Sequence, residues 1–235
     1  MEKCLCDMVF FWVTLYGLTY ICATNFSKAA FEKSWLIPAA MLIYTLILVL
    51  WIWRTNRAQM LGLCIPTCRN NIHWLCLPPL ALLPFYNLLS ADSYTLDLST
   101  AILMLSVSTV EEIFFRGFLL QLPVKHSKVF SIYLSSLLFS LFHLVNVSQG
   151  IDSGYIGMQV ICAFASGLCY SSAKIVTGSL LPCIAAHFLT NITGNSQLPQ
   201  TTASRISLWI CILVCIYWGI QSSFLISKFD KEIQV

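Results

Sequence analysis

Apolar runs of roughly 20 residues, separated by short polar stretches, follow one another along the whole chain. An α-helix needs about that length to cross the hydrocarbon core of a bilayer. The sequence shows no internal repeat and no low-complexity stretch. The pattern therefore predicts an all-α bundle of about eight transmembrane helices in a single domain, residues 1–235. The predicted spans are residues 7–24, 36–53, 73–90, 98–120, 128–147, 155–173, 176–193 and 206–227.

The first and third runs differ from a plain membrane span. The run at 7–24 lacks the basic start and the small-residue cleavage site of a secretory signal peptide, so it is not expected to be one. The third run contains Pro78, Pro79 and Pro84. Proline removes a helical hydrogen bond and clashes with the preceding turn, so we expect this helix to be broken or tilted.

Composition supports a membrane protein and excludes several other classes. Hydrophobic residues make up 58% of the chain and charged residues 10%, with a mean hydropathy of +0.79. Soluble domains carry about 25% charged residues. A disordered chain and a secreted disulfide module are excluded. A nucleic-acid-binding protein is excluded as well, because the formal net charge of +3 is too small and too scattered to follow a phosphate backbone.

Most of the 11 cysteines lie inside apolar runs, where cysteine behaves as a small hydrophobe. One group, Cys64, Cys68, His73 and Cys76, has roughly the spacing of zinc ligands. The prolines around it favour a turn at the membrane boundary followed by a helix. A zinc site is therefore the less favoured interpretation of this group.

Basic residues predict the orientation in the membrane, because cytoplasmic loops are enriched in lysine and arginine. With both termini in the cytoplasm, nine basic residues fall on the cytoplasmic side and three on the outer side. We therefore expect a multi-pass protein with cytoplasmic termini, and the short chain favours a bacterial plasma membrane. The nine are Lys3, Arg54, Arg57, Arg69, Lys125, Lys128, Lys174, Lys228 and Lys231, and the three are Lys28, Lys33 and Arg205.

The fourth run carries three charged residues, Glu111, Glu112 and Arg116, among apolar ones. An ionisable group at that depth costs about 3 kcal/mol or more, and it usually faces a bundle interior or a water-filled cavity. Glu112 and Arg116 are four residues apart and share a helix face, so we expect an ion pair. Glu111 points about 100° away around the helix and has no partner in its own run. The pattern predicts a structural glutamate at 112 and a working glutamate at 111.

Two other runs place hydrogen-bonding side chains at a similar depth. His143 lies near the end of the fifth run, one turn after Phe139, and His187 and Asn191 share a helix face in the seventh run. Each of them alone could be ordinary packing or a hydrogen bond between helices. Sharing one hydrated cavity with Glu111 would remove most of the cost of burying them in hydrocarbon. We therefore expect these groups to converge at mid-membrane depth.

The chemistry that this set permits is hydrolysis. A carboxylate in an apolar cavity can act as a base near neutral pH, and imidazole can shuttle a proton. No serine or cysteine is spaced to lie beside a base, so water is the expected nucleophile. Asn191 and His187 offer N–H donors for a developing oxyanion. The residues predict hydrolysis of a peptide or ester bond inside a membrane.

Three short motifs on separate predicted helices carry a resemblance to a known family. They read E-E-x-x-x-R at 111–116, F-x-x-x-H at 139–143 and H-x-x-x-N at 187–191. In this order they resemble the CAAX-protease and bacteriocin-processing family of intramembrane endopeptidases. Residues 1–97 add nothing to the resemblance.

The resemblance implies a glutamate-dependent endopeptidase with a catalytic core at about residues 98–193. It implies that Glu111 and His143 activate water, and that His187 and Asn191 form the oxyanion side of the site. The supporting residues would be Glu112, Arg116 and Phe139.

No cofactor is expected, although members of the family have also been called metalloproteases. The alternative zinc site would use Glu111, His143 and His187, a chemically sensible set of ligands. The chain has no H-E-x-x-H helix. Asn191 is a poor zinc ligand but a good oxyanion donor, so we favour the metal-free interpretation.

Two other functions stay open at this point. Buried charges also mark ion paths, but a proton- or ion-coupled transporter predicts inverted repeats, which the sequence does not show. A non-catalytic immunity or interaction protein could use the same scaffold. As a peptidase, the protein would act on a prenylated C-terminal peptide, a bacteriocin or pheromone precursor, or a membrane protein, and the short chain favours a small peptide precursor. The expected partners are therefore a peptide or lipid-modified peptide and membrane lipids.

Overall fold

The computed structural model describes residues 35–67, 77–90, 97–121, 127–149, 152–194 and 201–233. Every regular element in these ranges is helical, which confirms the all-α prediction. The α-helices are α3 (Leu36–Arg54), α4 (Ala58–Leu61), α6 (Leu82–Ser90), α7 (Leu98–Glu112), α8 (Lys128–Phe142), α9 (Ser153–Thr177), α10 (Leu181–Thr193) and α11 (Thr202–Ile233). Tighter or wider helical turns adjoin them at η1 (Pro78–Ala81), η2 (Ile113–Phe118), η3 (Leu119–Gln121) and η4 (His143–Gln149).

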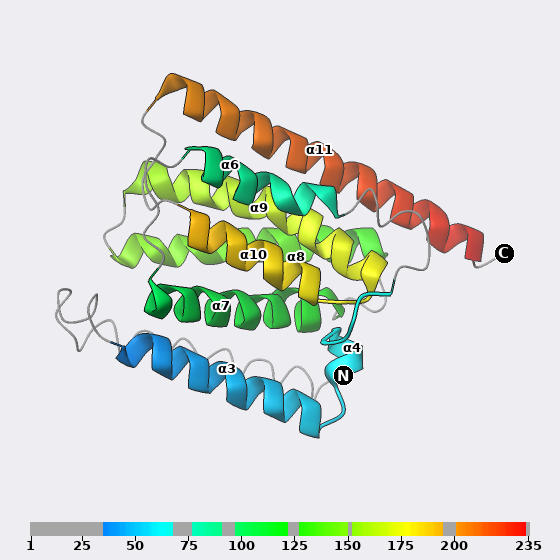
Figure 1. Cartoon of the computed structure of the whole chain (residues 1–235). Coiled ribbons are helices and arrows are strands. Elements are labelled where there is room, and N and C mark those ends of the chain that lie inside the picture. Colours follow the sequence, from blue (N-terminus) through cyan, green and yellow to red (C-terminus); the bar gives the residue numbers. More distant parts are fainter. Residues whose placement is uncertain are drawn as a thin grey trace.

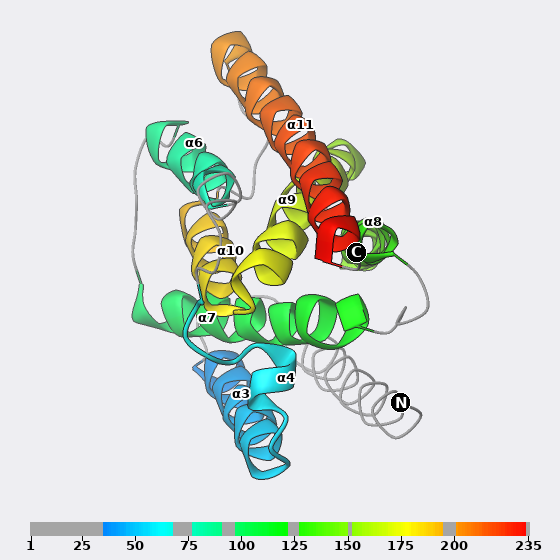
Figure 2. The ribbon, with the colours of Figure 1, turned by 90° about the vertical axis from the view of Figure 1, so that its right-hand side faces the viewer.

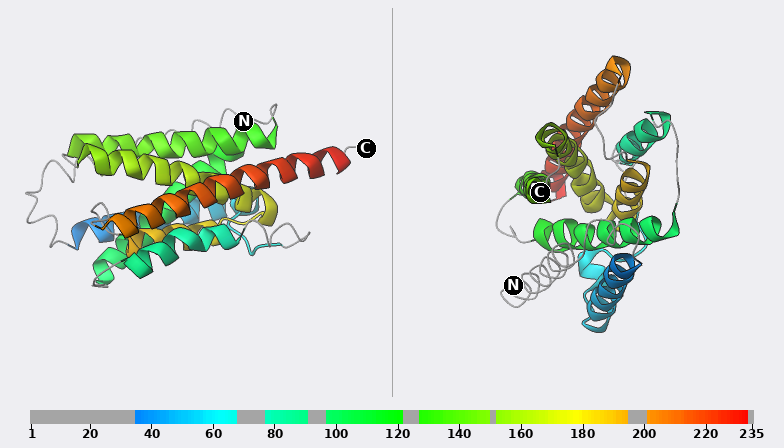
Figure 3. Two further views of the ribbon diagram at one scale, coloured as in Figure 1. Left: turned by 90° about the horizontal axis from the view of Figure 1, so that it is seen from above. Right: turned by 90° about the vertical axis from the view of Figure 1, so that its left-hand side faces the viewer.

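The long helices run lengthwise beside one another, with α7 between α3 and the other helices of the bundle (Figure 1). Seen from the end, α3 and α4 cover one side of α7, and α8, α9 and α10 lie on the other side (Figure 2). Helix α11 crosses the outer side of α9, and α6 packs beside α10 (Figure 3). Helix α7 therefore contacts both layers, which suits it to hold an internal site.

Five helical segments are long and apolar enough to cross a membrane: Leu36–Arg54, Leu98–Gln121, Lys128–Val147, Ser153–Thr177 and Thr202–Lys228. They match five of the predicted spans, and the protein is an integral membrane protein. The predicted span at 7–24 lies outside the described residues. Of the third predicted span, 73–90, the described part holds η1 and the nine-residue helix α6, which follow one another directly, with Pro84 inside α6.

The boundary between the sixth and seventh predicted spans was wrong. Helix α9 continues to Thr177, and α10 starts only at Leu181 and has 13 residues. Gly178 adopts the left-handed conformation at φ 68° that ends helices, and Pro182 lies in the first turn of α10. At a rise of about 1.5 Å per residue, α10 is about 20 Å long, shorter than the hydrocarbon core.

Polar caps fix the starts of the helices that carry the site. The Asp97 carboxylate accepts a hydrogen bond from the Thr100 N–H at 3.1 Å and so caps α7. Hydrogen bonds from the Ser99 hydroxyl and from the Thr100 N–H hold the pKa of this exposed carboxyl below its usual value. Ser127 and Asp152 cap α8 and α9 in the same way. These caps are sequence signals at predicted helix starts.

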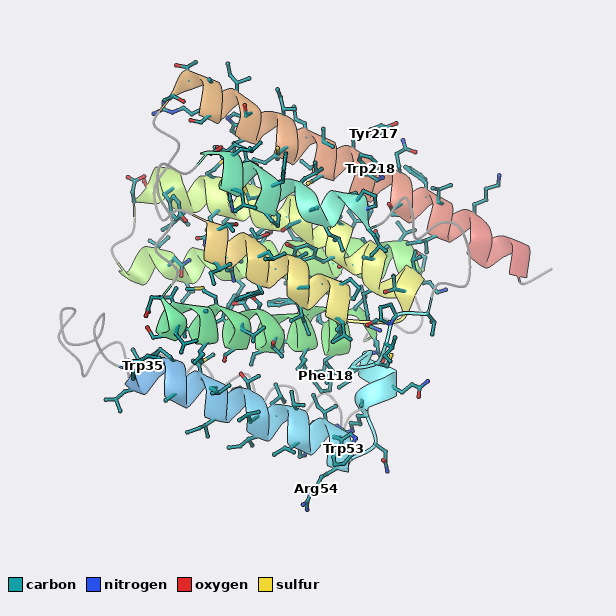
Figure 4. All side chains as sticks on the ribbon, in the orientation of Figure 1. Trp35, Trp53, Arg54, Phe118, Tyr217 and Trp218 are labelled. Atoms are coloured by element: carbon teal, nitrogen blue, oxygen red, sulfur yellow. The ribbon has the colours of Figure 1, made fainter. Side chains whose placement is uncertain are left out.

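One end of the bundle is basic. Helices α3, α9 and α11 end there and α8 begins there (Figure 1). Figure 4 shows Trp53 and Arg54 at this end of α3 and Trp35 at the other, so tryptophans mark both ends, as in the aromatic belts of membrane proteins. The basic residues of these helix ends and of the loop after α3 are Arg54, Arg57, Lys128, Lys174 and Lys228. Arg205, in the first turn of α11, lies at the opposite end.

The cysteine–histidine group with zinc-like spacing is only partly described. Cys64 lies in the described part, where its Sγ donates a hydrogen bond to the Gly178 carbonyl oxygen at 3.6 Å. Cys68, His73 and Cys76 lie outside the described residues.

Candidate active site

The buried ion pair expected on the fourth span is present. Arg116 Nη1 lies 2.8 Å from Glu112 Oε1, and both side chains are completely buried. At a rise of about 1.5 Å per residue, Glu112 lies about 20 Å along the helix axis from the start of α7 and about 14 Å from Gln121. The pair therefore lies inside the span, nearer to its end than to its start.

The helix changes character immediately after Glu112. Residues Ile113–Phe118 form a π-helical segment, η2, which includes Arg116. Such wider turns occur often at functional sites. The Ser135 hydroxyl, on α8, donates a hydrogen bond to the Phe115 carbonyl oxygen inside this segment at 2.8 Å, and Ser135 is fully buried. This bond ties the helix that carries the glutamates to the helix that carries His143.

Aromatic rings surround the rest of the Arg116 guanidinium. Its central carbon lies 4.0 Å from the centre of the Phe139 ring, 5.3 Å from that of Tyr170 and 5.9 Å from that of Phe115. Within the described part of the chain, Arg116 Nε and Nη2 have no hydrogen-bond partner. A desolvated cation over an aromatic face gains about 2 kcal/mol, so Phe139 is a direct support of the buried charge.

His187 lies between the two glutamates. Its Nδ1–H donates a hydrogen bond to Glu112 Oε1 at 2.9 Å, and its Nε2 lies 3.6 Å from Glu111 Oε2. The second distance is too long for a direct hydrogen bond. The Glu111 side chain keeps 16% of its surface exposed, whereas Glu112 keeps none. Glu111 is thus the accessible carboxylate, and Glu112 is the carboxylate held by two partners.

His143 lies at the end of α8, where the helix tightens into η4. Its Nδ1 is 3.0 Å from the Phe139 carbonyl oxygen, which can only accept, so Nδ1 carries the hydrogen and Nε2 is left for chemistry. The rings of His143 and His187 both meet the Phe139 ring edge to face, with centres 5.1 Å and 5.5 Å away.

Asn191 lies one turn after His187 on α10. Its Nδ2 donates a hydrogen bond to Ser108 Oγ, on α7, at 3.2 Å. Helices α7 and α10 run antiparallel here, because Ser108 faces Asn191 while Glu112 faces His187. The amide therefore lies one helical turn from the glutamates, towards the start of α7.

The described structure thus brings the residues of the three motifs into one group. Two contacts differ from the expectation, because Glu112 binds His187 as well as Arg116, and Asn191 is held by a serine. Ser108, Ser135 and Tyr170 also contact this group and were not predicted. Ser108 is four residues before Glu112 and Ser135 is four before Phe139, so the helical spacing was a signal for both. No comparable signal marked Tyr170.

The alternative zinc ligands Glu111, His143 and His187 do not form a metal site in this arrangement. Among the described residues, no group of three or more histidine, cysteine, aspartate or glutamate side chains could hold a metal ion. Glu112, which is not in that set, makes the short contact to His187. The metal-free interpretation stays a prediction.

Comparison with known proteins agrees with the motifs. Residues 95–193 match the model of a family described as type II CAAX prenyl endopeptidase Rce1-like. The match contains every motif residue of the candidate site and confirms the family resemblance for this part of the chain. No curated protein and no solved structure matches the chain.

Proposed function

We propose that the chain is a glutamate-dependent intramembrane endopeptidase, because residues 95–193 match the model of the Rce1-like CAAX prenyl endopeptidases. The proposal rests on the different environments of the two adjacent glutamates. Glu112 is buried and held by Arg116 and His187, whereas Glu111 is partly exposed beside His187. A base must reach its water, so Glu111 is the residue assigned to the chemistry.

In the proposed reaction, Glu111 is the base. Its carboxylate takes a proton from water, with His143 Nε2 as a second acceptor for that water, and the hydroxide attacks the carbonyl carbon of the scissile peptide bond. The oxygen of this carbonyl becomes an oxyanion that His187 Nε2–H and Asn191 Nδ2–H can stabilise. Glu111 then gives its proton to the leaving amine, the C–N bond breaks, and a carboxylate and an amine result.

His187 as a donor at Nε2 requires that the ring be protonated on both nitrogens. Its Nδ1–H is already committed to Glu112. With an imidazolium here, the two positive charges of Arg116 and His187 would equal the two negative charges of the glutamates. The group as a whole would then be neutral. A neutral cluster is much less costly inside a membrane than a charged one, which supports this assignment.

We propose a prenylated C-terminal peptide as the substrate. The description of the family favours it over the small unmodified precursor that the short chain suggested. In such peptides the cysteine of a C-terminal C-a-a-X sequence carries the prenyl chain. That chain would bring the scissile bond to the membrane, where the site lies.

The test is a cleavage assay with the purified full-length protein in liposomes. The probe is an internally quenched peptide ending in a farnesylated C-a-a-X sequence, and the matched control is the same peptide with a free cysteine thiol. We expect the farnesylated peptide alone to be cut within C-a-a-X, as seen by mass spectrometry. Equal cleavage of both peptides would overturn the substrate proposal, and cleavage of neither by folded protein would overturn the peptidase proposal.

Metal removal gives a separate prediction. In the proposed mechanism the base and the oxyanion donors are all side chains of this protein. Activity should therefore survive dialysis against a strong chelator with less than a twofold loss. Elemental analysis should find less than one zinc per chain. Zinc at one per chain that disappears in His143→Ala together with activity would contradict the metal-free mechanism.

A further inference from the structure

Ser108 is a polar residue that none of the three motifs includes. It lies on α7 with its surface completely buried. Its Oγ accepts a hydrogen bond from Asn191 Nδ2 at 3.2 Å. A buried hydroxyl costs free energy unless it is hydrogen-bonded, so a serine at this position requires a partner that alanine would not.

The Ser108–Asn191 bond repeats the Glu112–His187 bond one turn away. Ser108 and Glu112 are four residues apart on α7, and His187 and Asn191 are four apart on α10. Two side-chain bonds therefore connect the same pair of antiparallel helices at successive turns. Each bond fixes one of the two side chains that the proposed reaction places beside the oxyanion.

We propose that Ser108 is a positioning residue that orients the Asn191 amide as an oxyanion donor. This inference rests on the function proposed above for Asn191. An amide nitrogen carries two hydrogens. With one of them held by Ser108, the second has a fixed direction, and Asn191 does not need to reorganise when negative charge develops.

Ser108 does not itself act on substrate in this proposal. Its side chain is fully buried, and its hydroxyl lies beside an amide rather than beside a base. The same burial makes it a suitable anchor, because a hydrogen bond that excludes water holds its partner more firmly than an exposed one. Ser108 therefore acts only through Asn191.

The experiment measures kcat and KM of the full-length protein in liposomes with the farnesylated peptide. Ser108→Ala should lower kcat about tenfold and leave KM within twofold, because the lost preorganisation acts in the transition state. Ser106→Ala is the matched control. Ser106 is also buried on α7, but it lies about 200° around the helix from Ser108. The kcat of the Ser106→Ala variant should stay within twofold of that of the unchanged protein.

A double-mutant cycle separates positioning from general packing. Asn191→Ala should lower kcat more than Ser108→Ala does, and adding Ser108→Ala to it should have no further effect. Additive losses would overturn the proposal, because they would mean that Ser108 acts independently of Asn191. An Asn191→Ala variant with unchanged kcat would instead contradict the oxyanion role of Asn191 in the proposed function.

A pair of equal-sized variants keeps the test valid if alanine destabilises the fold. Ser108→Thr and Ser108→Val have nearly the same shape and differ in the hydroxyl group. The threonine variant should be at least fivefold faster than the valine variant at equal thermal stability. Equal kcat values for the two would show that the hydroxyl does not position Asn191.

Discussion

At the residue scale, Arg116 combines full burial with a single carboxylate partner and three aromatic neighbours. Its charge is balanced by Glu112 and by the faces of Phe115, Phe139 and Tyr170. This arrangement explains why a phenylalanine precedes His143 by one turn. The guanidinium of Arg116 lies over the face of the Phe139 ring, and the rings of His143 and His187 pack against it edge to face. The Phe139 side chain therefore connects all three motifs.

Arg116→Ala should destabilise the protein strongly. Removing the cation leaves Glu112 buried with only His187 beside it, and breaking a buried ion pair costs about 3–5 kcal/mol. Thermal unfolding in detergent should show a clearly lower midpoint than the unchanged protein. Arg54→Ala, which removes an exposed arginine at the end of α3, should leave the midpoint nearly unchanged. Equal midpoints for both variants would contradict the structural role of Arg116.

The sequence predicted contacts within a helix better than contacts between helices. The Glu112–Arg116 pair follows from a spacing of four on one helix. The contact from His187 to Glu112 depends on how α10 is rotated and shifted against α7, which no spacing within either helix determines. Spacing on α7 places Ser108 on the same face as Glu112, but its contact with Asn191 depends on the same rotation and shift of α10.

At the element scale, close packing of α8 against α9 holds the arginine in place. Gly167 on α9 lies where a Cβ atom would be 3.1 Å from Ser136 and 3.2 Å from Arg116 Nη2. A larger residue there must push α9 away from α8 or displace the guanidinium. Glycine is therefore favoured here by the close approach of these neighbours rather than by backbone conformation.

Gly167→Ala should lower both stability and activity. An added methyl group in a close-packed interior costs about 1–3 kcal/mol, and here it also displaces the partner of Glu112. Gly157→Ala on the same helix is the matched control, because no atom lies within 4 Å of its added Cβ. The control should be as stable as the unchanged protein or slightly more stable, since alanine favours helix. The test measures the unfolding midpoint and the cleavage rate of both variants. If Gly167→Ala were as stable and as active as Gly157→Ala, close packing at Gly167 would be refuted.

Element boundaries followed hydropathy only in part. Five spans were predicted within a few residues, but the turn between α9 and α10 lies inside a continuous apolar stretch. Its position is set by the left-handed Gly178 and by a hydrogen bond from the Leu180 N–H to the Gly62 carbonyl oxygen at 2.7 Å. The second of these is a tertiary contact. The π-helical segment after Glu112 likewise had no signal in the hydrophobic pattern.

At the scale of the whole molecule, the uneven distribution of basic side chains gives an orientation. Among the described residues, five basic side chains lie at or near the end of the bundle where α3 and α9 end and α8 begins, and Arg205 lies at the other end. Asp97 and Asp152 cap helices at that other end. Because cytoplasmic loops are enriched in basic residues, we infer that the basic end faces the cytoplasm.

A reporter fused after Val235 should therefore be cytoplasmic, because α11 ends at the basic end (Figure 1). In a bacterial host, a green fluorescent protein fusion should fluoresce and an alkaline phosphatase fusion should be inactive. The same two reporters placed in the loop between α10 and α11 serve as the control and should give the opposite result. Active phosphatase at the C-terminus would reverse the inferred orientation.

We propose that Glu111 is the base and that Glu112 is its structural neighbour. The most direct measurement is the cleavage rate of Glu111→Gln on the farnesylated peptide, in protein whose unfolding midpoint equals that of the unchanged chain. Glutamine keeps the shape but cannot accept a proton, so the rate should fall at least a hundredfold, as expected when a general base is lost. A folded Glu111→Gln protein that cleaves at the unchanged rate, with a stable Glu112→Gln protein that does not, would contradict the account and exchange the two roles.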